Sequence, residues 1–472
     1  MASRSPNDLQ HPPTTRQELY DRIKESSKAQ VIEAEMVRYG FWTTAPPTDP
    51  KSDAARIKQI RRELKAAETE ASRTRNIDKT LKAQRTQRMK DARARREETK
   101  ARRIAASKAR AEAWAQRKET EILYLGAGVS TGLSDFRADE AKLAAVGLPH
   151  FPTALSLAAA MGITVAELRF LAFHRKVSRT SHYQRFEIPK KSGGKRLISA
   201  PMPRLKAAQA WVLETILSRV PVHDAAHGFR TARSIVTNAQ PHVGAGLVVN
   251  MDLKDFFPTI THRRVLGVLR GLGYSHAIAT ILALLCTEPR ITAVEMDGQR
   301  WFIARGERVL PQGAPTSPAL TNILCRRLDQ RMSGLAAKLS MAYTRYADDM
   351  TFSGGDDAPV GVLLGVTAKI VADEGLVIHP DKTRVMRRGR RHEVTGVVVN
   401  EKLSVDRRMV RRLRAVLYQI EQSGPEGKHW DGEEDNLLLT VFGYANFVRM
   451  VDPARGEPLA ARARALLERY GA

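Results

Sequence analysis

Two β-favouring segments that carry carboxylates constrain this fold most. The first, VVNMDLKDFFPTI (248–260), begins as an apolar strand whose alternation places Asp252 on one face. The second, TRYADDMTFSG (344–354), sets Asp348 beside Asp349, between an aromatic residue and an apolar run. Adjacent like charges repel, and burial beside apolar neighbours disfavours ionising both of them. A positive partner is therefore expected beside the pair.

The flanks of the Asp pair predict a β-hairpin with the carboxylates at its tip. If this hairpin pairs with the Asp252 strand, three carboxylates converge. Oxygen-rich sites of this kind suit Mg²⁺, with Mn²⁺ as an alternative. Two such ions about 3.5–4 Å apart can activate a 3′-hydroxyl and stabilise a leaving pyrophosphate. Either fragment alone is equally typical of a turn or a surface charge, so the prediction depends on further motifs.

The charge balance predicts a polyanionic partner. The 472 residues include 77 Lys and Arg against 51 Asp and Glu, a net charge of +26. Residues 51–120 hold 23 basic and 10 acidic side chains, a net +13, in a stretch nearly free of Gly and Pro. We expect one long helix or two there. The stretch is interpreted either as a solvated charged helix or as an arm that contacts RNA or DNA.

Other features indicate where a chain of this kind works. A hydrophobic content of 43% is ample for a core, and the two cysteines, Cys286 and Cys325, lie in apolar contexts that favour free buried thiols. The amino terminus lacks the apolar centre of a signal peptide, and no window approaches ~20 apolar residues. We expect a soluble cytoplasmic protein with no membrane contact.

Three further segments are suited to nucleotide handling. FEIPKKSGGKRLISAP (186–201) predicts a hairpin that presents Lys195 and Arg196 to a triphosphate, with a solvated hairpin tip as the alternative. In VLPQGAPTSPALTNILCRRLD (309–329), the turn at Gln312 and Gly313 would approach a nucleotide and template closely. GLVIHPDKTRVM (375–386) offers Lys382 to protonate a departing pyrophosphate.

The motifs NMDLKDFF, PQGAPTSP, YADD and HPDKT, in this order, resemble those of reverse transcriptases from about Tyr183 onward. The resemblance implies an α+β right-hand polymerase with fingers, a palm with an antiparallel sheet, and a helical thumb. It implies that Asp252, Asp348 and Asp349 are the catalytic metal ligands. It also implies that Phe257 is the steric gate, an apolar wall that leaves a ribose 2′-hydroxyl unpaired and so favours dNTPs.

A narrower resemblance is to the retron reverse transcriptases of bacteria. NAQPH (238–242) matches their NAxxH element and VTG (394–396) their second marker. The resemblance implies synthesis of branched msDNA on a structured non-coding RNA, primed from the 2′-hydroxyl of an internal guanosine. It further implies anti-phage defence with an effector protein. The expected RNA-binding residues are Asn238, His242, Val394, Thr395 and Gly396.

The expected domains are a disordered tail with a short helix and a Pro-rich linker (1–50), a basic helical arm (51–120), fingers and palm (121–400), and a helical thumb (401–472). One alternative is a group II intron or diversity-generating reverse transcriptase. The intron type predicts a maturase or endonuclease region after the thumb, and none fits after Val451. The other alternative is a non-catalytic RNA-binding scaffold or antitoxin, against which the complete Asp set argues.

Overall fold

The computed structural model describes residues 15–25, 28–41, 50–73, 77–189, 193–430 and 436–471. The chain divides into two compact units, Met1–Lys108 and Ala109–Ala472, and each is described by itself. The predicted disordered tail and most of the predicted Pro-rich linker lie outside the described residues.

The first unit is helical. Its elements are α1 (Arg16–Glu25), α2 (Lys28–Arg38), α3 (Pro50–Arg73) and α4 (Ile77–Thr120), the last of which continues into the second unit. The described side chains of α3 and α4 are exposed, so their many charges are hydrated. Ala, Arg, Lys, Glu and Gln dominate both helices, and these residues lose little side-chain freedom in a helix. The span 51–120 therefore forms two helices.

The second unit is an α+β body. Its first part contains α5 (Glu140–Ala145), α6 (Ala154–Ala160), α7 (Val165–Ala172), β1 (Val177–Ser178), β2 (Tyr183–Pro189), β3 (Lys195–Pro201), α8 (Pro203–Thr215), η2 (Leu217–Arg219), α9 (Ile235–Ala239), η3 (Gln240–His242) and β4 (Leu247–Asp252). Its middle contains α10 (His262–Gly271), α11 (His276–Cys286), β5 (Glu288–Met296), β6 (Gln299–Val309), α12 (Thr316–Leu324), α13 (Arg326–Lys338), β7 (Ala342–Tyr346), β8 (Asp349–Gly354) and α14 (Val360–Asp373). Its last part contains β9 (Arg384–Arg387), β10 (Glu393–Val394), β11 (Val397–Val398), α15 (Arg407–Ser423), α16 (Leu437–Val451) and α17 (Pro453–Tyr470).

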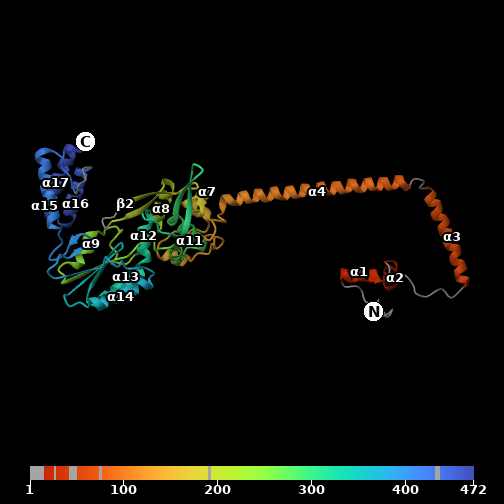
Figure 1. The fold of residues 1–472 in the computed structure, drawn as a ribbon, viewed down its shortest axis with the longest axis horizontal. Helices are drawn as coiled ribbons and strands as arrows, with labels where there is room; N and C mark the ends of the chain where they lie inside the picture. Colours follow the sequence, from red (N-terminus) through yellow and green to blue (C-terminus); the bar gives the residue numbers. More distant parts are fainter. Residues whose placement is uncertain are drawn as a thin grey trace. The chain divides into compact units, whose positions relative to one another are not determined.

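A four-stranded antiparallel sheet, ordered β7-β8-β4-β9, is the palm. The alternation along β4 sends Leu247, Val249 and Met251 into a core with α13 and α14, which lie along this face of the sheet (Figure 1). Val248 faces a second core on the opposite side. Because successive side chains alternate, Asp252 shares the face of Val248 and is free of the α13–α14 core.

The fingers are built from helices α5–α8 and α10–α12 around a third apolar core, which contains α11 almost entirely. Two antiparallel arrays extend from this core. One is the β2–β3 hairpin, in which Pro189 is paired with Lys195, and the other is the sheet β1-β6-β5. The fold class expected from the sequence, a right-hand polymerase body with a basic helical extension, is confirmed.

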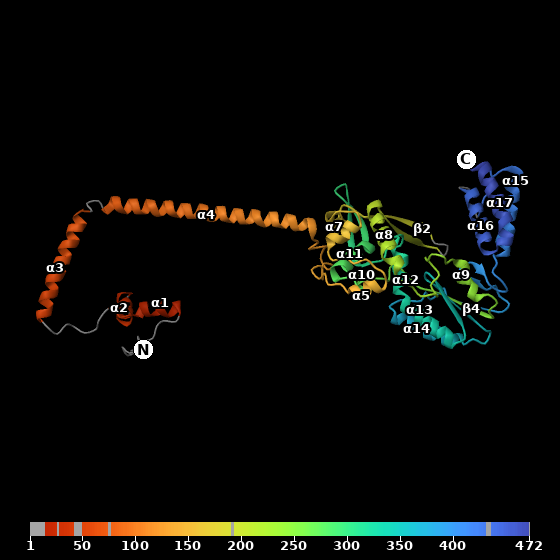
Figure 2. The same ribbon diagram turned by 180° about the vertical axis from the view of Figure 1, so that it is seen from behind.

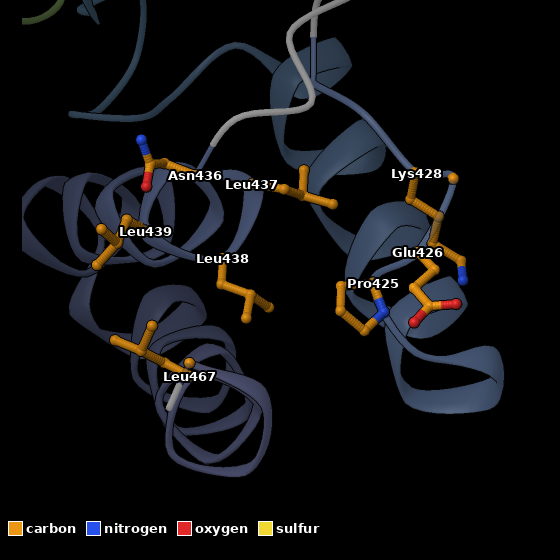
Figure 3. Close-up of a pocket in the computed structure, with 10 residues that line it drawn as sticks. Pro425, Glu426, Lys428, Asn436, Leu437, Leu438, Leu439 and Leu467 are labelled. Carbon is orange, nitrogen blue, oxygen red and sulfur yellow. The ribbon is translucent and has the colours of Figure 1, made fainter.

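The thumb is a bundle of α15, α16 and α17 at the carboxyl end of the chain (Figures 1 and 2). Its core joins that of the β10–β11 hairpin. A cavity of about 430 Å³ lies in this bundle. Figure 3 shows Pro425 and Glu426 on one side of it and Leu438 and Leu467 on the other. Its lining combines four leucines with polar side chains and contains none of the predicted site residues, so we assign it no role in the chemistry.

Within the described part of the chain, no single helix combines the length and the apolar composition needed to cross a membrane. The bent pair α6 and α7 meets both criteria only when the two helices are taken together. Both cysteines are free and buried, as the sequence predicted.

Candidate active site

The carboxylates gather where β4 ends against the β7–β8 hairpin. Asp252 and Asp349 are direct cross-strand partners, so their side chains leave the same face of the sheet. The Leu253 amide donates to the Asp348 carbonyl at 3.0 Å, which fixes the tip of the hairpin against β4. Ala347, in the turn itself, has φ +57°, an uncommon backbone conformation for a non-glycine residue. The tertiary structure thus holds the Asp pair in a strained turn.

A cleft of about 1060 Å³ opens in front of this turn. It brings together seven of the predicted site residues from five separate segments: Lys195, Arg196, Asp252, Phe257, Gln312, Asp348 and Lys382. The cleft has the size expected of a ligand pocket or slightly more. Asp349 and Gly313 stand beside the cleft without lining it.

Lys382 places a positive charge near the Asp pair, although its ion pair is with Asp252. Its Nζ lies 2.9 Å from Oδ2 of Asp252. The HPDKT segment reaches this position because the His379 amide donates to the Asp252 carbonyl at 2.7 Å. A cation on a flexible stem thereby shares the cleft with the carboxylates.

The electrostatics of the Asp pair are those of crowded acids. Burial, and then repulsion from Asp252, raise the pKa of Asp348. Burial, followed by repulsion from Asp348 and Asp252, raises the pKa of Asp349 to about 6. Lys382 opposes both shifts without cancelling them. A cation bound nearby would therefore stabilise the ionised form of both carboxylates.

The donor set fits a divalent metal that substrate completes. Across the described residues, no three His, Cys, Asp or Glu side chains form a ready-made metal cluster. The three predicted carboxylates lie close enough for Asp252 and Asp348 to raise the pKa of Asp349, but only Asp252 and Asp348 line the cleft. Mg²⁺ is usually held by one or two carboxylates together with substrate phosphates and water. The carboxylates of Asp252 and Asp348, which line the cleft, meet that requirement.

The two nucleotide-handling loops are held together by the backbone. The Ser199 amide of β3 donates to the Gln312 carbonyl at 2.7 Å. Gly313, with φ +119°, is needed there because a Cβ would lie 3.0 Å from the Ser199 carbonyl oxygen. Lys195 is exposed at the cleft and pairs with Glu187 at 2.8 Å, so a phosphate would have to compete with that carboxylate.

The predicted RNA contacts of the NAQPH element need correction. Asn238 and His242 are both fully buried, which leaves neither side chain accessible to RNA. The two His242 ring nitrogens lie 2.7 Å from Ser353 Oγ and 2.8 Å from Thr344 Oγ1, so the ring cross-braces β7 and β8. Burial lowers the pKa of His242 to about 4, and the ring is neutral. These residues support the catalytic hairpin from behind.

The VTG element has a related position. Val394 is fully buried, so its expected contact with RNA is corrected to a packing role. Thr395 and Gly396 both have positive φ and form the two-residue turn between β10 and β11. Asn238 Nδ2 lies 3.4 Å from Thr395 Oγ1, which connects the two retron elements. Of the five expected RNA-binding residues, Thr395 is part-exposed and Gly396 is exposed.

Sequence reasoning missed the loop at Gly228 and Phe229. A Cβ on Gly228 would lie 2.6 Å from the Ala347 amide nitrogen, so only glycine permits this approach to the catalytic turn. Phe229 has φ +59° and lines the cleft, with its ring centroid 6.4 Å from that of Phe257. The sequence HGFR (227–230) shows no hydrophobic periodicity that would have predicted this role, because the role depends on a contact with Ala347, far along the chain.

A second missed feature is the buried ion pair behind the hairpin. Arg345 and Asp329 have no exposed side-chain surface and form a two-pronged contact, with both nitrogen–oxygen distances 2.7 Å. Arg345 also donates to the Ala347 carbonyl at 2.9 Å and to Asn322 Oδ1 at 3.1 Å. Asn322 in turn donates to the Gly228 carbonyl at 2.8 Å. The available signal in the sequence was Arg345 itself, a single charged residue in the β-favouring segment that forms β7.

Comparisons with known proteins agree with this geometry. The family described as reverse transcriptase (RNA-dependent DNA polymerase) matches residues 188–404. The chain is 46% identical to the retron Mx162 reverse transcriptase of Myxococcus xanthus, over 74% of this chain and 75% of that protein. It is 45% identical to the retron Mx65 reverse transcriptase of the same organism, over 70% and 75% respectively. It is 33% identical to the retron Ec86 reverse transcriptase of Escherichia coli, over 70% and 94%. The chain therefore belongs to the retron reverse transcriptases and is an RNA-directed DNA polymerase.

Proposed function

We propose that this polymerase copies a structured non-coding RNA into branched, RNA-linked msDNA, primed from the 2′-hydroxyl of an internal guanosine. With an effector protein, this product would serve anti-phage defence. The observation that carries the proposal is the cleft in which Asp252, Asp348 and Lys382 face a basic hairpin, in a chain with close retron relatives. The net charge of +26 fits a nucleic-acid partner.

In the proposed reaction, a ribose hydroxyl oxygen attacks the α-phosphorus of a dNTP. The new O–P bond forms as the bond to the β-phosphate bridging oxygen breaks, the hydroxyl proton passes to water, and pyrophosphate leaves. Asp252, Asp348 and Asp349 would hold two Mg²⁺ ions, which would lower the pKa of the hydroxyl and offset the charge of the phosphates. Arg196 and Lys195 steady the triphosphate, and Lys382 donates a proton to the leaving pyrophosphate.

Phe257 is proposed as the wall that excludes ribonucleotides. We expect Phe257→Val to raise the ratio of rNTP to dNTP incorporation efficiency by roughly 10- to 100-fold, because the wall no longer crowds a 2′-hydroxyl. Single-nucleotide extension with each substrate measures this ratio. Phe186→Ala, which removes an exposed ring of β2 outside the cleft, is the control and should leave the ratio unchanged. An unchanged ratio in Phe257→Val would remove the gate from this position.

The crowded acids predict a pH-dependent response to Mg²⁺. A raised carboxyl pKa means that the metal-free folded protein binds protons more tightly than the unfolded chain does. Its stability therefore falls as pH rises through about 6, the pKa of Asp349, while the freed carboxylates become available to metal. We expect the Mg²⁺-induced rise in Tm to be larger at pH 7.5 than at pH 5. In Asp349→Asn the difference between the two pH values should shrink. An undiminished difference in that variant would contradict the role of the Asp349 carboxylate in the Mg²⁺ response.

We propose that the basic arm contacts the RNA or msDNA backbone. Its support is the net +13 of residues 51–120 and the exposure of the described side chains in α3 and α4. Phosphate contacts release counterions, so affinity falls with salt in proportion to their number. Deletion of residues 1–108, the first compact unit, should make the salt dependence of RNA affinity less steep. An unchanged slope would favour a solvated helix without contacts.

The nucleic acid that co-purifies with the full chain tests the proposed product. Sequencing should find DNA whose 5′ end is joined to the 2′-oxygen of one RNA guanosine, and a debranching enzyme should release it. The Asp348→Asn protein should carry the RNA without the DNA. Unbranched DNA would favour another reverse transcriptase type. RNA alone with the unsubstituted protein would favour the scaffold alternative.

A further inference from the structure

We propose that a groove at the start of the second unit binds unpaired nucleotides of the RNA, by stacking their bases on aromatic side chains. The groove has a volume of about 500 Å³ and is lined by Trp114, Lys118, Tyr124, Phe170, Phe173 and Arg175, among others. It shares no residue with the catalytic cleft. The inference rests on the proposed function, since an RNA-copying enzyme must hold an RNA that contains unpaired segments.

The aromatic rings of the groove are unusually open to solvent. Trp114, Tyr124 and Phe170 are 47%, 52% and 39% exposed, and they come from the end of α4, the following loop and α7. The core-facing side of α7 is already occupied by other residues, including Leu168 and Leu171. Phe170 is therefore not needed to fill the core. Exposed rings from three segments around one groove form a platform on which bases can stack.

The cations of the groove are arranged for phosphate. The guanidinium carbon of Arg175 lies 5.0 Å from the ring centroids of both Phe170 and Phe173, so it has a cation–π contact with each ring. Among the described residues it has no carboxylate partner. The Lys118 ammonium lies 5.5 Å from the Trp114 ring centroid. Stacked cations of this kind keep their charge available at the edge of an aromatic surface.

Charge favours a nucleic acid over a protein as the occupant. Lys118, Arg169 and Arg175 line the groove against a single acid, Glu121. That carboxylate is paired with Arg117 at 2.7 Å, which neutralises it. The surface is thus aromatic with an excess of positive charge, the combination that binds single strands with little sequence preference.

The chain beyond Arg175 extends the same chemistry. It enters β1, which pairs with β6, and the Arg179 guanidinium then lies 4.7 Å from the Trp301 ring centroid. Arg179 is thus a third cation stacked on a ring, a few residues after Arg175 along the chain. Several consecutive unpaired nucleotides, rather than one base, are the expected ligand.

Photocrosslinking of the full chain with a short oligouridine that carries 4-thiouridine tests the proposal. Crosslinked peptides should include Trp114, Tyr124 or Phe170. The double variant Trp114→Ala/Tyr124→Ala should lose these crosslinks and bind the oligouridine at least about fivefold more weakly. An oligomer of the same length without bases should bind the wild-type protein and the double variant equally, because the two substitutions remove stacking partners and leave the cations of the groove in place. Leu155→Ala, whose side chain is also 47% exposed but lies on α6 outside the groove, is the control.

Crosslinks confined to the palm and thumb, with affinity for the oligouridine changed less than twofold, would overturn the proposal. A self-associated wild-type protein that the double variant dissociates would overturn it as well, in favour of a protein-binding face. Failure of the proposed function is a separate result, namely no RNA-templated dNTP incorporation by the unsubstituted chain. The folding of each variant is checked by its thermal unfolding, which substitution of exposed side chains should leave unchanged.

Discussion

Asp348→Asn is expected to lower the rate of dNTP incorporation by at least about 10³-fold, because a neutral amide is a poor ligand for the metal that offsets several kcal/mol of transition-state charge. The same substitution should leave the metal-free protein as stable as before, or more stable. The reason is that burial and the neighbouring Asp252 already disfavour the charged form of Asp348. Single-nucleotide extension and thermal unfolding in EDTA measure the two quantities.

The chain contains a matched control for this experiment. A second Asp pair, Asp356 and Asp357, follows β8 at its other end, where both side chains are exposed. Asp357→Asn removes the same charge from the same dipeptide and should leave synthesis unchanged. Equal losses in both variants, or an active Asp348→Asn protein, would show that catalysis does not depend on the β7–β8 turn.

Loss of the buried ion pair behind the turn should have the largest effect on folding. Arg345→Met leaves Asp329 as a buried charge without a cationic partner, with only the Tyr343 hydroxyl donating to it, which costs about 3–5 kcal/mol of unfolding free energy. The double variant Arg345→Met/Asp329→Leu should recover most of that loss, since no charge then stays buried. Denaturant unfolding of both single variants and the double variant completes the cycle.

The same cycle separates stability from positioning. Arg345 also donates to the Ala347 carbonyl, one residue before Asp348, and to Asn322, which holds the Gly228 loop. The refolded double variant should therefore remain slow in dNTP incorporation although its stability is restored. Recovery of both stability and rate would reduce Arg345 to a structural partner of Asp329.

The carboxylates of the cleft could be placed from the sequence, for a physical reason. The period-two alternation of LVVNMD fixes the face on which Asp252 stands, and apolar flanks define the hairpin that carries Asp348. Lys382 and Gln312 followed from motif order along the chain. Asp252 ends β4 and Asp348 directly precedes β8, where local pattern determines direction, whereas Gln312 and Lys382 lie in loops.

The residues that support the catalytic turn from the protein interior could not be predicted in this way. NAQPH is polar, and polar strings usually lie on the surface. His242 is buried because Thr344 and Ser353, far along the chain, satisfy both of its ring nitrogens. Gly228 depends likewise on the close approach of Ala347. Such roles follow from tertiary contacts, which no periodicity in a single sequence encodes.

The most direct test of the account is a crystal structure of the full chain with Mn²⁺ and an unreactive dNTP analogue, read by anomalous scattering. We predict manganese peaks in the cleft, in contact with the carboxylates of Asp252 and Asp348 and with the triphosphate, while Lys382 turns from Asp252 towards the phosphates. Manganese bound elsewhere, or a triphosphate seated away from these two carboxylates, would contradict the account.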